Sequence, residues 1–231
     1  CVVAFLFCSG FTLTVVDPFS GRVPVYMNGE LVVTGSMIDD TTYVPVRAFC
    51  ESLMDDASVS WDQASGTVTV SSPELVIEVQ VGEYYMTANE RPLYAQDGIL
   101  NVDGTVMAPI RTIAQAFGVG INWDEHTSSI DLDGSEMAII QSADEAYDED
   151  DLYWLSRLIY SESGNQPLEG MIAVGNVVLN RVESELFPDT IYGVISQSGQ
   201  FDVFSSGAIY STPNELSVIA AMLCLDGVEV I

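Results

Sequence analysis

The chain has 231 residues, and 48% of them are hydrophobic, which is enough for two or three small domains with packed cores. Acidic residues outnumber basic ones 34 to 6, so the formal net charge is −28. A surface this acidic repels nucleic acids and anionic membranes, which excludes both as primary partners. The four cysteines form no C-x-x-C pair and His126 is the one histidine, so the composition argues against a Cys/His metal site. Cys50 and Cys224 lie in apolar helical surroundings and are expected to be buried thiols.

Residues 1–20 are predicted to be an incomplete signal or anchor segment. The first sixteen are mostly apolar and carry no charge. That length suits the apolar region of a secretion signal and is short for a membrane span. The alternative is a core strand. The signal interpretation places the protein outside the cytoplasm.

An internal repeat occupies residues 21–136, with copies at about residues 24–72 and 80–134. The shared residues, each with its counterpart, are Pro45 and Pro109, Arg47 and Arg111, and Trp61 and Trp123. The first two pairs are 64 residues apart and the third is 62 apart, so the second copy has lost two residues between its helix and its tryptophan.

Each copy is predicted to contain a hairpin, a short helix and a second hairpin. An Asn-Gly pair at residues 28–29 is a turn signal in the first copy. The strand after each Trp-Asp pair alternates polar and apolar residues, over 67–70 and over 129–132. Because both tryptophans begin such a pattern, we interpret Trp61 and Trp123 as core residues, with a sugar-binding platform as the alternative.

Residues 137–150 are predicted to form an acidic linker. The alternation and the glycine of an EF-hand calcium loop are missing from this stretch. Its last acidic residues favour the first turn of the helix that follows, because they complement the helix dipole.

The next helix carries a candidate catalytic carboxylate. Leu152, Leu155, Ile159 and Glu162 are spaced by three, four and three residues, which puts them on one helical face. A carboxyl group on an apolar face loses water, and this favours its neutral, proton-donating form. Such a group is a suitable general acid for cleaving a glycosidic bond. The alternative is that Glu162 ends the helix and points to solvent.

A second helix is predicted from Leu168 to about Ser184, after a Gly-Asn-Gln-Pro turn. It is apolar on nearly all sides, which is typical of a helix buried in a core, and Gly175 leaves room for a close neighbour. Loops follow to residue 207. Thr212 then begins a capping box for a third helix that ends near Leu225, and a strand is expected from Val228.

Five segments in this part carry a family resemblance. They are LIYSESGNQPLEG at 158–170, IAVGNVVLNRV at 172–182, FPDTIYGVI at 187–195, GQF at 199–201 and TPNE at 212–215. In this order and spacing they resemble the spore-cortex-lytic and cell-wall hydrolase family, from about residue 149 to the end. The resemblance implies a lysozyme-like fold and muramidase chemistry on peptidoglycan, with Glu162 as the acid. It also implies a further C-terminal strand, so the domain at 151–231 is expected to be incomplete at its C-terminus.

The resemblance implies a substrate groove around that glutamate. The residues expected to contact the glycan are Tyr160, Gln166, Gln200, Phe201 and Tyr210. No metal and no cofactor are expected. Peptidoglycan glycan strands are the expected partner, with no nucleic acid and no membrane beyond a possible N-terminal anchor. The protein is expected to be secreted or to lie in the cell wall or spore envelope.

The two repeats resemble the copper amine oxidase N-terminal-like domain. The name implies no copper here, because one histidine cannot form the histidine cluster of a copper site. We interpret the repeats as a targeting or spacer module.

The predicted fold class is α+β, with tandem hairpin-helix-hairpin repeats followed by a mainly helical lysozyme-like domain. The predicted function is cleavage of the MurNAc–GlcNAc bond. A lytic transglycosylase is preferred to a hydrolase because the motifs offer no second carboxylate. The alternative is a non-catalytic protein that binds the cell wall or spore surface.

Overall fold

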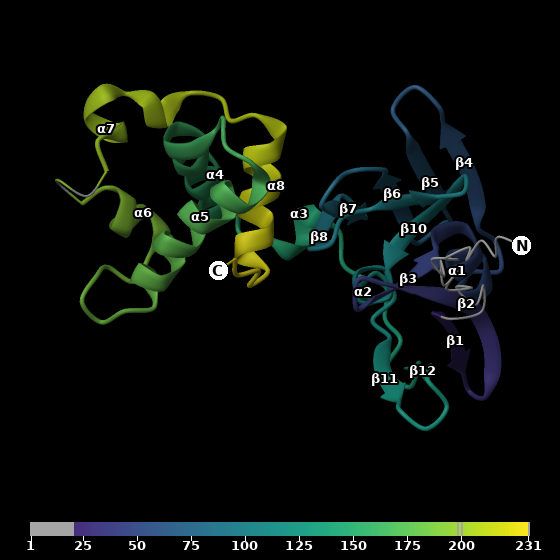
Figure 1. The fold of residues 1–231 in the computed structure, drawn as a ribbon. Helices are drawn as coiled ribbons and strands as arrows, with labels where there is room; N and C mark the ends of the chain where they lie inside the picture. Colours follow the sequence, from purple (N-terminus) through teal and green to yellow (C-terminus); the bar gives the residue numbers. More distant parts are fainter. Residues whose placement is uncertain (1–20, 198, 200, 231) are drawn as a thin grey trace, which may run out of the picture.

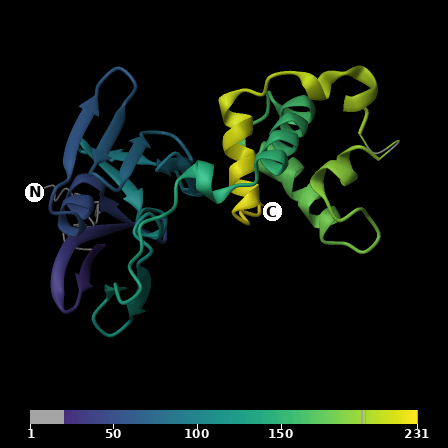
Figure 2. The same cartoon turned by 180° about the vertical axis from the view of Figure 1, so that it is seen from behind.

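A computed structural model gives the fold of residues 21–197, 199 and 201–230. The predicted signal segment at 1–20 and Gln200 lie outside the described residues. Two hydrophobic cores are present, one formed by the strands with α1 and α2, the other by α4 to α8. We name the first part, residues 21–140, the repeat module, and the second, residues 149–230, the helical module. The α+β class predicted from the sequence is confirmed. Figure 1 and Figure 2 show the two modules from opposite sides, with α3 (Ala143–Ala146) between them.

The repeat module consists of two β-sheets and two short helices. The seven-stranded sheet has the order β11-β12-β1-β2-β3-β10-β9, and the five-stranded sheet has the order β4-β5-β6-β7-β8. The elements are β1 Arg22–Met27, β2 Glu30–Ile38, β3 Thr41–Pro45, α1 Val46–Leu53, β4 Ser58–Asp62, β5 Thr67–Ser71, β6 Val76–Gln80, β7 Tyr85–Ala88, β8 Arg91–Tyr94, β9 Leu100–Val102, β10 Thr105–Pro109, α2 Ile110–Gln115, β11 Gly120–Asp124 and β12 Ser129–Asp133.

The two copies of the repeat meet at a pair of equivalent strands. Strands β3 and β10 occupy the same place in the two copies, and they pair with each other in antiparallel fashion. Val44 lies opposite Ala108, its own counterpart 64 residues later, which is the register of a self-complementary contact. The second hairpins extend the two sheets in different ways. Strand β12 of the second copy pairs in parallel with β1 of the first, whereas β5 of the first copy pairs in antiparallel fashion with β6, which lies between the copies. The two copies therefore share a β-sheet and form one domain rather than two separate ones.

The first hairpin turn of each copy has the backbone that its sequence requires. Asn28 and Gly29 have φ values of 53° and 78°, as the Asn-Gly pair predicted. The counterpart turn uses Asn89 and Glu90, with φ values of 50° and 66°. The predicted turn is confirmed.

The interpretation of the two tryptophans as core residues is wrong. Trp61 is 46% exposed and Trp123 is 44% exposed. Both lie on edge strands, β4 and β11, which have one neighbouring strand each. Their cross-strand partners, Val68 and Ile130, are buried. The alternating pattern of β5 and β12 therefore marks the core, and the larger aromatic rings stand at its rim.

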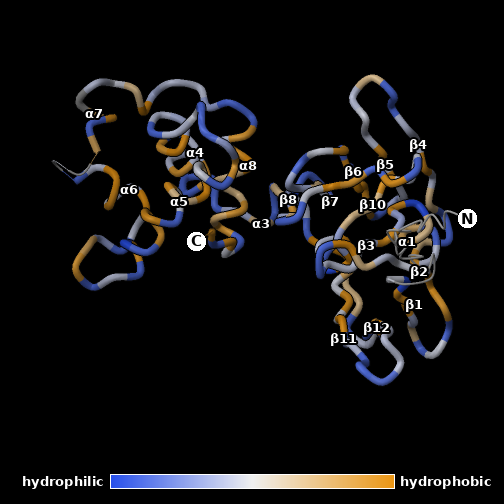
Figure 3. Tube along the Cα trace, viewed as in Figure 1, coloured by the Kyte–Doolittle hydropathy of each residue, from blue (hydrophilic) through white to orange (hydrophobic). Residues whose placement is uncertain are grey.

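The helical module is built around three helices that contact one another. These are α4 (Glu149–Ser163), α5 (Leu168–Val182) and α8 (Glu215–Leu225), with α6 (Ile191–Ile195), α7 (Val203–Ser206) and the 3-10 turn η1 (Ala208–Tyr210) around them. Figure 3 shows hydrophobic residues along α6 and α8, in contrast to the hydrophilic tip of the β11–β12 hairpin.

Two predictions for the helical module are wrong. Helix α5 is not buried on all sides, because Ala173 and Val177 are exposed on the side away from α4 and α8. Residues 228–230 form no strand. They run instead beside α5, where the Asn176 side-chain amide donates to the Val228 carbonyl (2.9 Å) and accepts from the Val230 N–H (3.4 Å).

The acidic stretch before α4 caps that helix. The Asp148 carboxylate accepts hydrogen bonds from the N–H groups of Asp150 and Asp151 at 3.0 and 3.1 Å. Glu149, Asp150 and Asp151 lie in the first turn, where negative charge complements the helix dipole. Ahead of this cap the chain is tied to the repeat module, because the Ala143 N–H donates to the Asn89 carbonyl at 3.1 Å.

A partly buried ion pair joins the two modules. Arg91 of β8 donates to both carboxylate oxygens of Asp226, just after α8, at 3.0 and 2.5 Å. The Tyr147 hydroxyl donates to the same carboxylate at 2.7 Å. Tyr85 and Tyr94 of the repeat module pack against the helical core. None of the described helices is both long and apolar enough to cross a membrane.

Candidate active site

An open groove lies at the corner where α4 turns into α5. Its volume is about 450 Å³. Its lining residues come from the end of α4, the turn to α5 and the η1 region, and are Tyr160, Ser161, Glu162, Gly164, Asn165, Ala208 and Ser211. The sequence prediction that Glu162 and Tyr160 share one groove fits this arrangement.

The prediction that Glu162 continues a buried apolar face is wrong. Leu155 and Ile159 are fully buried, but Glu162 is exposed. Glu162 lies in the last turn of α4 beside the groove, between the half-buried Ser161 and the buried Ser163. Its carboxylate therefore faces water and any ligand that fills the groove.

Gly164 and Asn214 fix the turn between α4 and α5. A Cβ atom at Gly164 would lie 2.5 Å from the Tyr160 carbonyl, so the tight turn after α4 requires glycine. The Asn214 side-chain amide donates to the Gly164 carbonyl at 3.0 Å. Asn214 also accepts from the Ser217 N–H at 2.8 Å and is thereby the N-cap of α8. The predicted cap at Thr212 is wrong by two residues, and the observed cap links α8 to the groove.

The core beneath the groove is closely packed at Gly175. A Cβ atom there would lie 2.5 Å from the Cys224 sulfur and 3.1 Å from Cδ1 of Ile159, so α4, α5 and α8 meet at this point. The predicted close contact at Gly175 is confirmed. Burial raises the pKa of the Cys224 thiol to about 12, and its S–H lies 3.4 Å from the Ile172 carbonyl. Cys50 is likewise buried, so both predicted buried thiols are confirmed.

Three of the predicted substrate-binding residues are placed at or near the groove. Tyr160 lines it. Gln166 is exposed just before α5, and its backbone N–H donates a hydrogen bond to the Ser163 carbonyl (2.8 Å). It does not line the groove. Tyr210 is 64% exposed and lies between Ala208 and Ser211, which do line it.

Phe201, another predicted substrate-binding residue, does not line the groove. Phe201 is partly buried against the helical core, and the Arg181 guanidinium lies 5.2 Å from its ring. Gln200 lies outside the described residues. The Phe201 ring is used for packing, and its contact with substrate stays a prediction.

Sequence reasoning missed two residues that line the groove. Ser161 and Asn165 line it, and both belong to the segment that surrounds Glu162, so position in that segment was the available signal. A row of aromatic rings also runs from α4 to η1. Consecutive ring centres lie 4.9 to 6.4 Å apart along Trp154, Tyr192, Phe204 and Tyr210. Tyr192 and Tyr210 are exposed and offer flat apolar surface to a sugar, whereas Trp154 and Phe204 pack against the helical core.

Glu162 is the one carboxylate among the described groove residues. Glu169, the nearest acidic residue along the chain, acts electrostatically on Tyr94 and so lies toward the repeat module. No cluster of three or more His, Cys, Asp or Glu residues that would suit a metal ion occurs in the described ranges. The local chemistry is thus that of a single acid in a polar, neutral groove.

Two protein-family models match the chain. Residues 26–132 match the copper amine oxidase N-terminal domain, and residues 165–230 match the cell wall hydrolase family. The chain therefore contains a copper amine oxidase N-terminal domain followed by a cell wall hydrolase domain, as the sequence resemblances predicted. Glu162 lies just before the matched range begins.

Curated relatives of the helical module are spore cortex-lytic enzymes. The one from Bacillus cereus is 38% identical over 81 residues, which cover 35% of this chain and 31% of the relative. The one from Oceanobacillus iheyensis is 35% identical over 83 residues, which cover 36% of this chain and 30% of the relative. The chain thus spans about a third of the length of the curated relatives it matches.

Two solved structures are similar over the same share of the chain. They are the catalytic domain of the Bacillus cereus SleB protein and the catalytic domain of the germination-specific lytic transglycosylase SleB from Bacillus anthracis. Both are 37% identical and cover 36% of this chain, and they cover 65% and 68% of the respective solved chains. The TM-score is 0.34 in each case.

Proposed function

We propose that the helical module is a lytic transglycosylase that cleaves peptidoglycan between MurNAc and GlcNAc, with Glu162 as its catalytic residue. The match to the cell wall hydrolase family supports the substrate class. The observation that carries the proposal is the open groove in which Glu162 is the one carboxylate among the described lining residues. The protein acts outside the cytoplasm, on the vegetative wall or on spore cortex.

The reaction needs one group that first gives and then takes a proton. Glu162 protonates the glycosidic oxygen, and the bond from that oxygen to C1 of MurNAc breaks. The 6-hydroxyl of the same MurNAc then bonds to C1, and its proton returns to the Glu162 carboxylate. The products are a GlcNAc with a free 4-hydroxyl and a 1,6-anhydro-MurNAc end. Atoms balance without water, metal or cofactor.

A single carboxylate favours this route over hydrolysis. A glycoside hydrolase of the usual type places a second carboxylate about 5–10 Å from the acid, as nucleophile or as base for water. No described residue of the groove offers that second group. The internal 6-hydroxyl removes the need for it.

The exposed carboxylate becomes a better acid when substrate covers it. The groove is open without ligand, so water reaches Glu162. A glycan lying along Tyr160, Asn165 and the exposed Tyr210 would displace that water, and loss of water favours the neutral, proton-donating carboxylic acid. The side chains of Ser161 and Asn165 are the nearest described donors for sugar hydroxyl and amide groups.

The experiment compares Glu162→Gln with Glu169→Gln on purified sacculi. We expect Glu162→Gln to lower the rate of muropeptide release roughly 10²- to 10⁴-fold, the contribution of a general acid. Glu169→Gln is the matched control, because it removes the next carboxylate along the chain, which lies toward Tyr94. Its rate should stay close to wild type. Full activity of Glu162→Gln would falsify the assignment.

Wall binding without cleavage is the second candidate function. It is favoured by the exposure of Trp61 and Trp123 in the repeat module. Under this alternative the protein sediments with sacculi and releases no soluble muropeptides, and Glu162→Gln changes neither result.

A further inference from the structure

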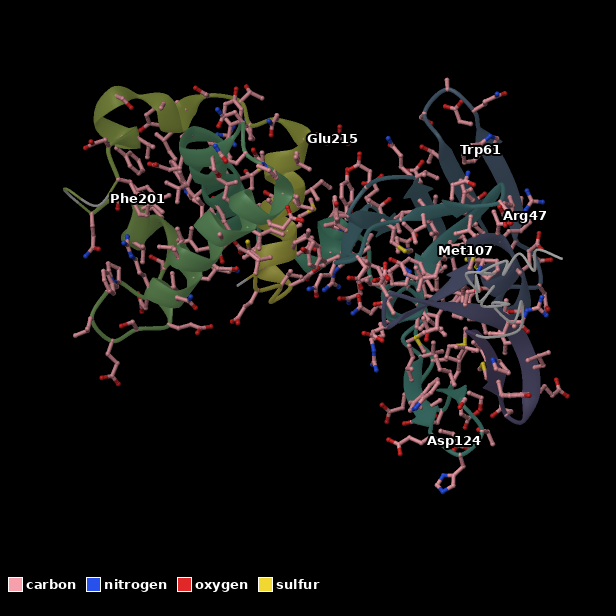
Figure 4. The ribbon with its side chains drawn as sticks, in the orientation of Figure 1. Arg47, Trp61, Met107, Asp124, Phe201 and Glu215 are labelled. Carbon is pink, nitrogen blue, oxygen red and sulfur yellow. The ribbon has the colours of Figure 1, made fainter. Side chains whose placement is uncertain are left out.

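The repeat module has a pocket built around Trp61. The volume of the pocket is about 350 Å³, within the range of small-ligand sites. Arg47 of α1, Trp61 of β4 and its cross-strand partner Val68 form one wall. The opposite wall is the β9–β10 hairpin of the other repeat copy, through Asn101, Gly104 and Thr105. Figure 4 shows Arg47 and Trp61 near each other, on the side of the repeat module away from the helical module.

The second copy repeats this pocket with the same three positions. Arg111 of α2, Trp123 of β11 and its cross-strand partner Ile130 line a pocket of about 460 Å³. Its opposite wall includes the β2–β3 hairpin of the first copy, through Asp40, Thr41 and Thr42. Each pocket is thus completed by a hairpin of the other copy, at equivalent positions of the repeat. A group of side chains that recurs in both copies is a property of the repeat and not of one surface loop.

The two pocket arginines have side chains without a partner among the described residues of a very acidic chain. The guanidinium groups of Arg47 and Arg111 form no ion pair, hydrogen bond or ring contact there, whereas Arg22 has an interaction of its own. The other three arginines have contacts: Arg91 pairs with Asp226, Arg157 lies over the Tyr153 ring, and Arg181 lies near the Phe187 and Phe201 rings. A free guanidinium beside an exposed indole offers a charged fork for a carboxylate and a flat apolar face for a sugar ring.

We propose that these two pockets bind the peptide-bearing sugars of the cell wall, with the MurNAc ring on the tryptophan and a stem-peptide carboxylate on the arginine. The choice of peptidoglycan as the occupant rests on the proposed function of the helical module. Charge complementarity supports it: a chain of net charge −28 is repelled by an anionic polymer over most of its surface, and attraction requires local unpaired cations.

The two pockets differ in their expected affinity for an anionic ligand. The Trp61 pocket has no carboxylate among its described lining residues. The Trp123 pocket also contains Asp40 and Asp97, whose charges oppose an anionic ligand. The Trp61 pocket is therefore expected to bind such a ligand more tightly than the Trp123 pocket. The pockets lie toward opposite ends of the repeat module, with Trp61 at one end and Asp124, next to Trp123, at the other (Figure 4). Occupation of both increases retention on a polymer without new contacts.

The test measures sedimentation of the full chain with purified sacculi, in a Glu162→Gln background so that the polymer stays intact. We expect Trp61→Ala and Arg47→Gln each to weaken binding roughly tenfold, and Trp123→Ala and Arg111→Gln to weaken it less. Raised salt should reduce the difference between wild type and Arg47→Gln, because screening weakens the same contact. Tyr84→Ala is the control, since Tyr84 is 45% exposed in the same module and lines neither pocket.

Three results would overturn the proposal. One is unchanged sacculus binding of Trp61→Ala and Arg47→Gln. Another is equal affinity for sacculi and for neutral chitin, because the arginine would then recognise no carboxylate. The third is a Trp61-dependent dimer in sedimentation analysis, because the occupant would then be a second, acidic copy of the chain. These results are separable from failure of the proposed function: cleavage by wild type with Trp-independent binding removes only this proposal, and Trp-dependent binding without cleavage removes only the transglycosylase.

Discussion

The groove of the helical module and the two pockets of the repeat module have opposite electrostatics. The groove of the helical module contains one carboxylate and no arginine among its described lining residues, since Arg157 and Arg181 lie against aromatic rings. The repeat module instead exposes two unpaired arginines beside two open tryptophans. A proton donor works best away from cations that would hold its charge, whereas retention of an anionic strand needs them. The comparison suggests that cleavage and retention are separated because their electrostatic requirements conflict.

The largest expected effect separates these two roles. Glu162→Gln should abolish most cleavage, by the factor given above, and leave sedimentation with sacculi unchanged. The Trp61→Ala/Trp123→Ala double variant should lose most binding to sacculi and cleave short soluble glycans at close to the wild-type rate. Both variants are measured in both assays. If either substitution lowered both quantities by similar factors, the separation of roles would be wrong.

Overpacking at Gly175 should destabilise the helical module by about 1–3 kcal/mol, because an added methyl group collides with Cys224 and Ile159. The measurement is urea unfolding of Gly175→Ala followed by hydrogen exchange of each module. Protection should fall in α4, α5 and α8 and stay constant in the repeat module. Val177→Ala, on the exposed side of the same helix, is the control and should change the stability little. Equal loss in both modules would show that they unfold as one unit.

The Arg91–Asp226 ion pair should contribute a smaller, shared stability. Its side chains are 24% and 17% exposed, which is intermediate between surface pairs and buried pairs. Asp226→Asn should therefore lower the free energy of unfolding by about 1–2 kcal/mol. It should also separate the thermal transitions of the two modules, measured by calorimetry. A transition that stays single and unshifted would contradict a coupling role for this contact.

Tyr147 should give this contact a pH dependence. Burial, and next the hydrogen bond to Asp226, raise the pKa of Tyr147 above its ordinary value. A group whose pKa is raised by folding contributes stability that is complete below its unfolded pKa, near 10, and is lost as pH rises above it. The wild type should therefore lose stability above about pH 10, and Tyr147→Phe should lose about 1 kcal/mol less over the same range. The difference between the two pH profiles isolates Tyr147 from other tyrosines.

Sequence patterns predicted those features that depend on local geometry or exact recurrence. The 64-residue shift identified two equivalent copies, and the Asn28-Gly29 turn and the close packing at Gly175 follow from backbone rules. The self-pairing of β3 with β10 could not be predicted, because repetition does not say which strands of the copies are neighbours. The prediction that Trp61 is buried failed for the same reason, because an edge strand and a central strand have the same alternating pattern.

The candidate site shows a similar division. Helical periodicity grouped Glu162 with Leu155 and Ile159. Its exposure could not be read from that period, because the period does not show that a groove lies beside the last turn of α4. Ala208 and Ser211 reach the groove across a long sequence separation, and their own residue types carry no signal for it. The role of Asn214 depends on a contact to Gly164, fifty residues away, which no capping rule includes.

The most direct test of the central claim is mass spectrometry of the soluble fragments released from sacculi in water enriched in heavy oxygen. The single carboxylate of the groove predicts fragments that end in 1,6-anhydro-MurNAc, are one water lighter than reducing-end products, and contain no heavy oxygen. Reducing-end MurNAc carrying heavy oxygen would contradict it, because water would then be the nucleophile and a second carboxylate would be required.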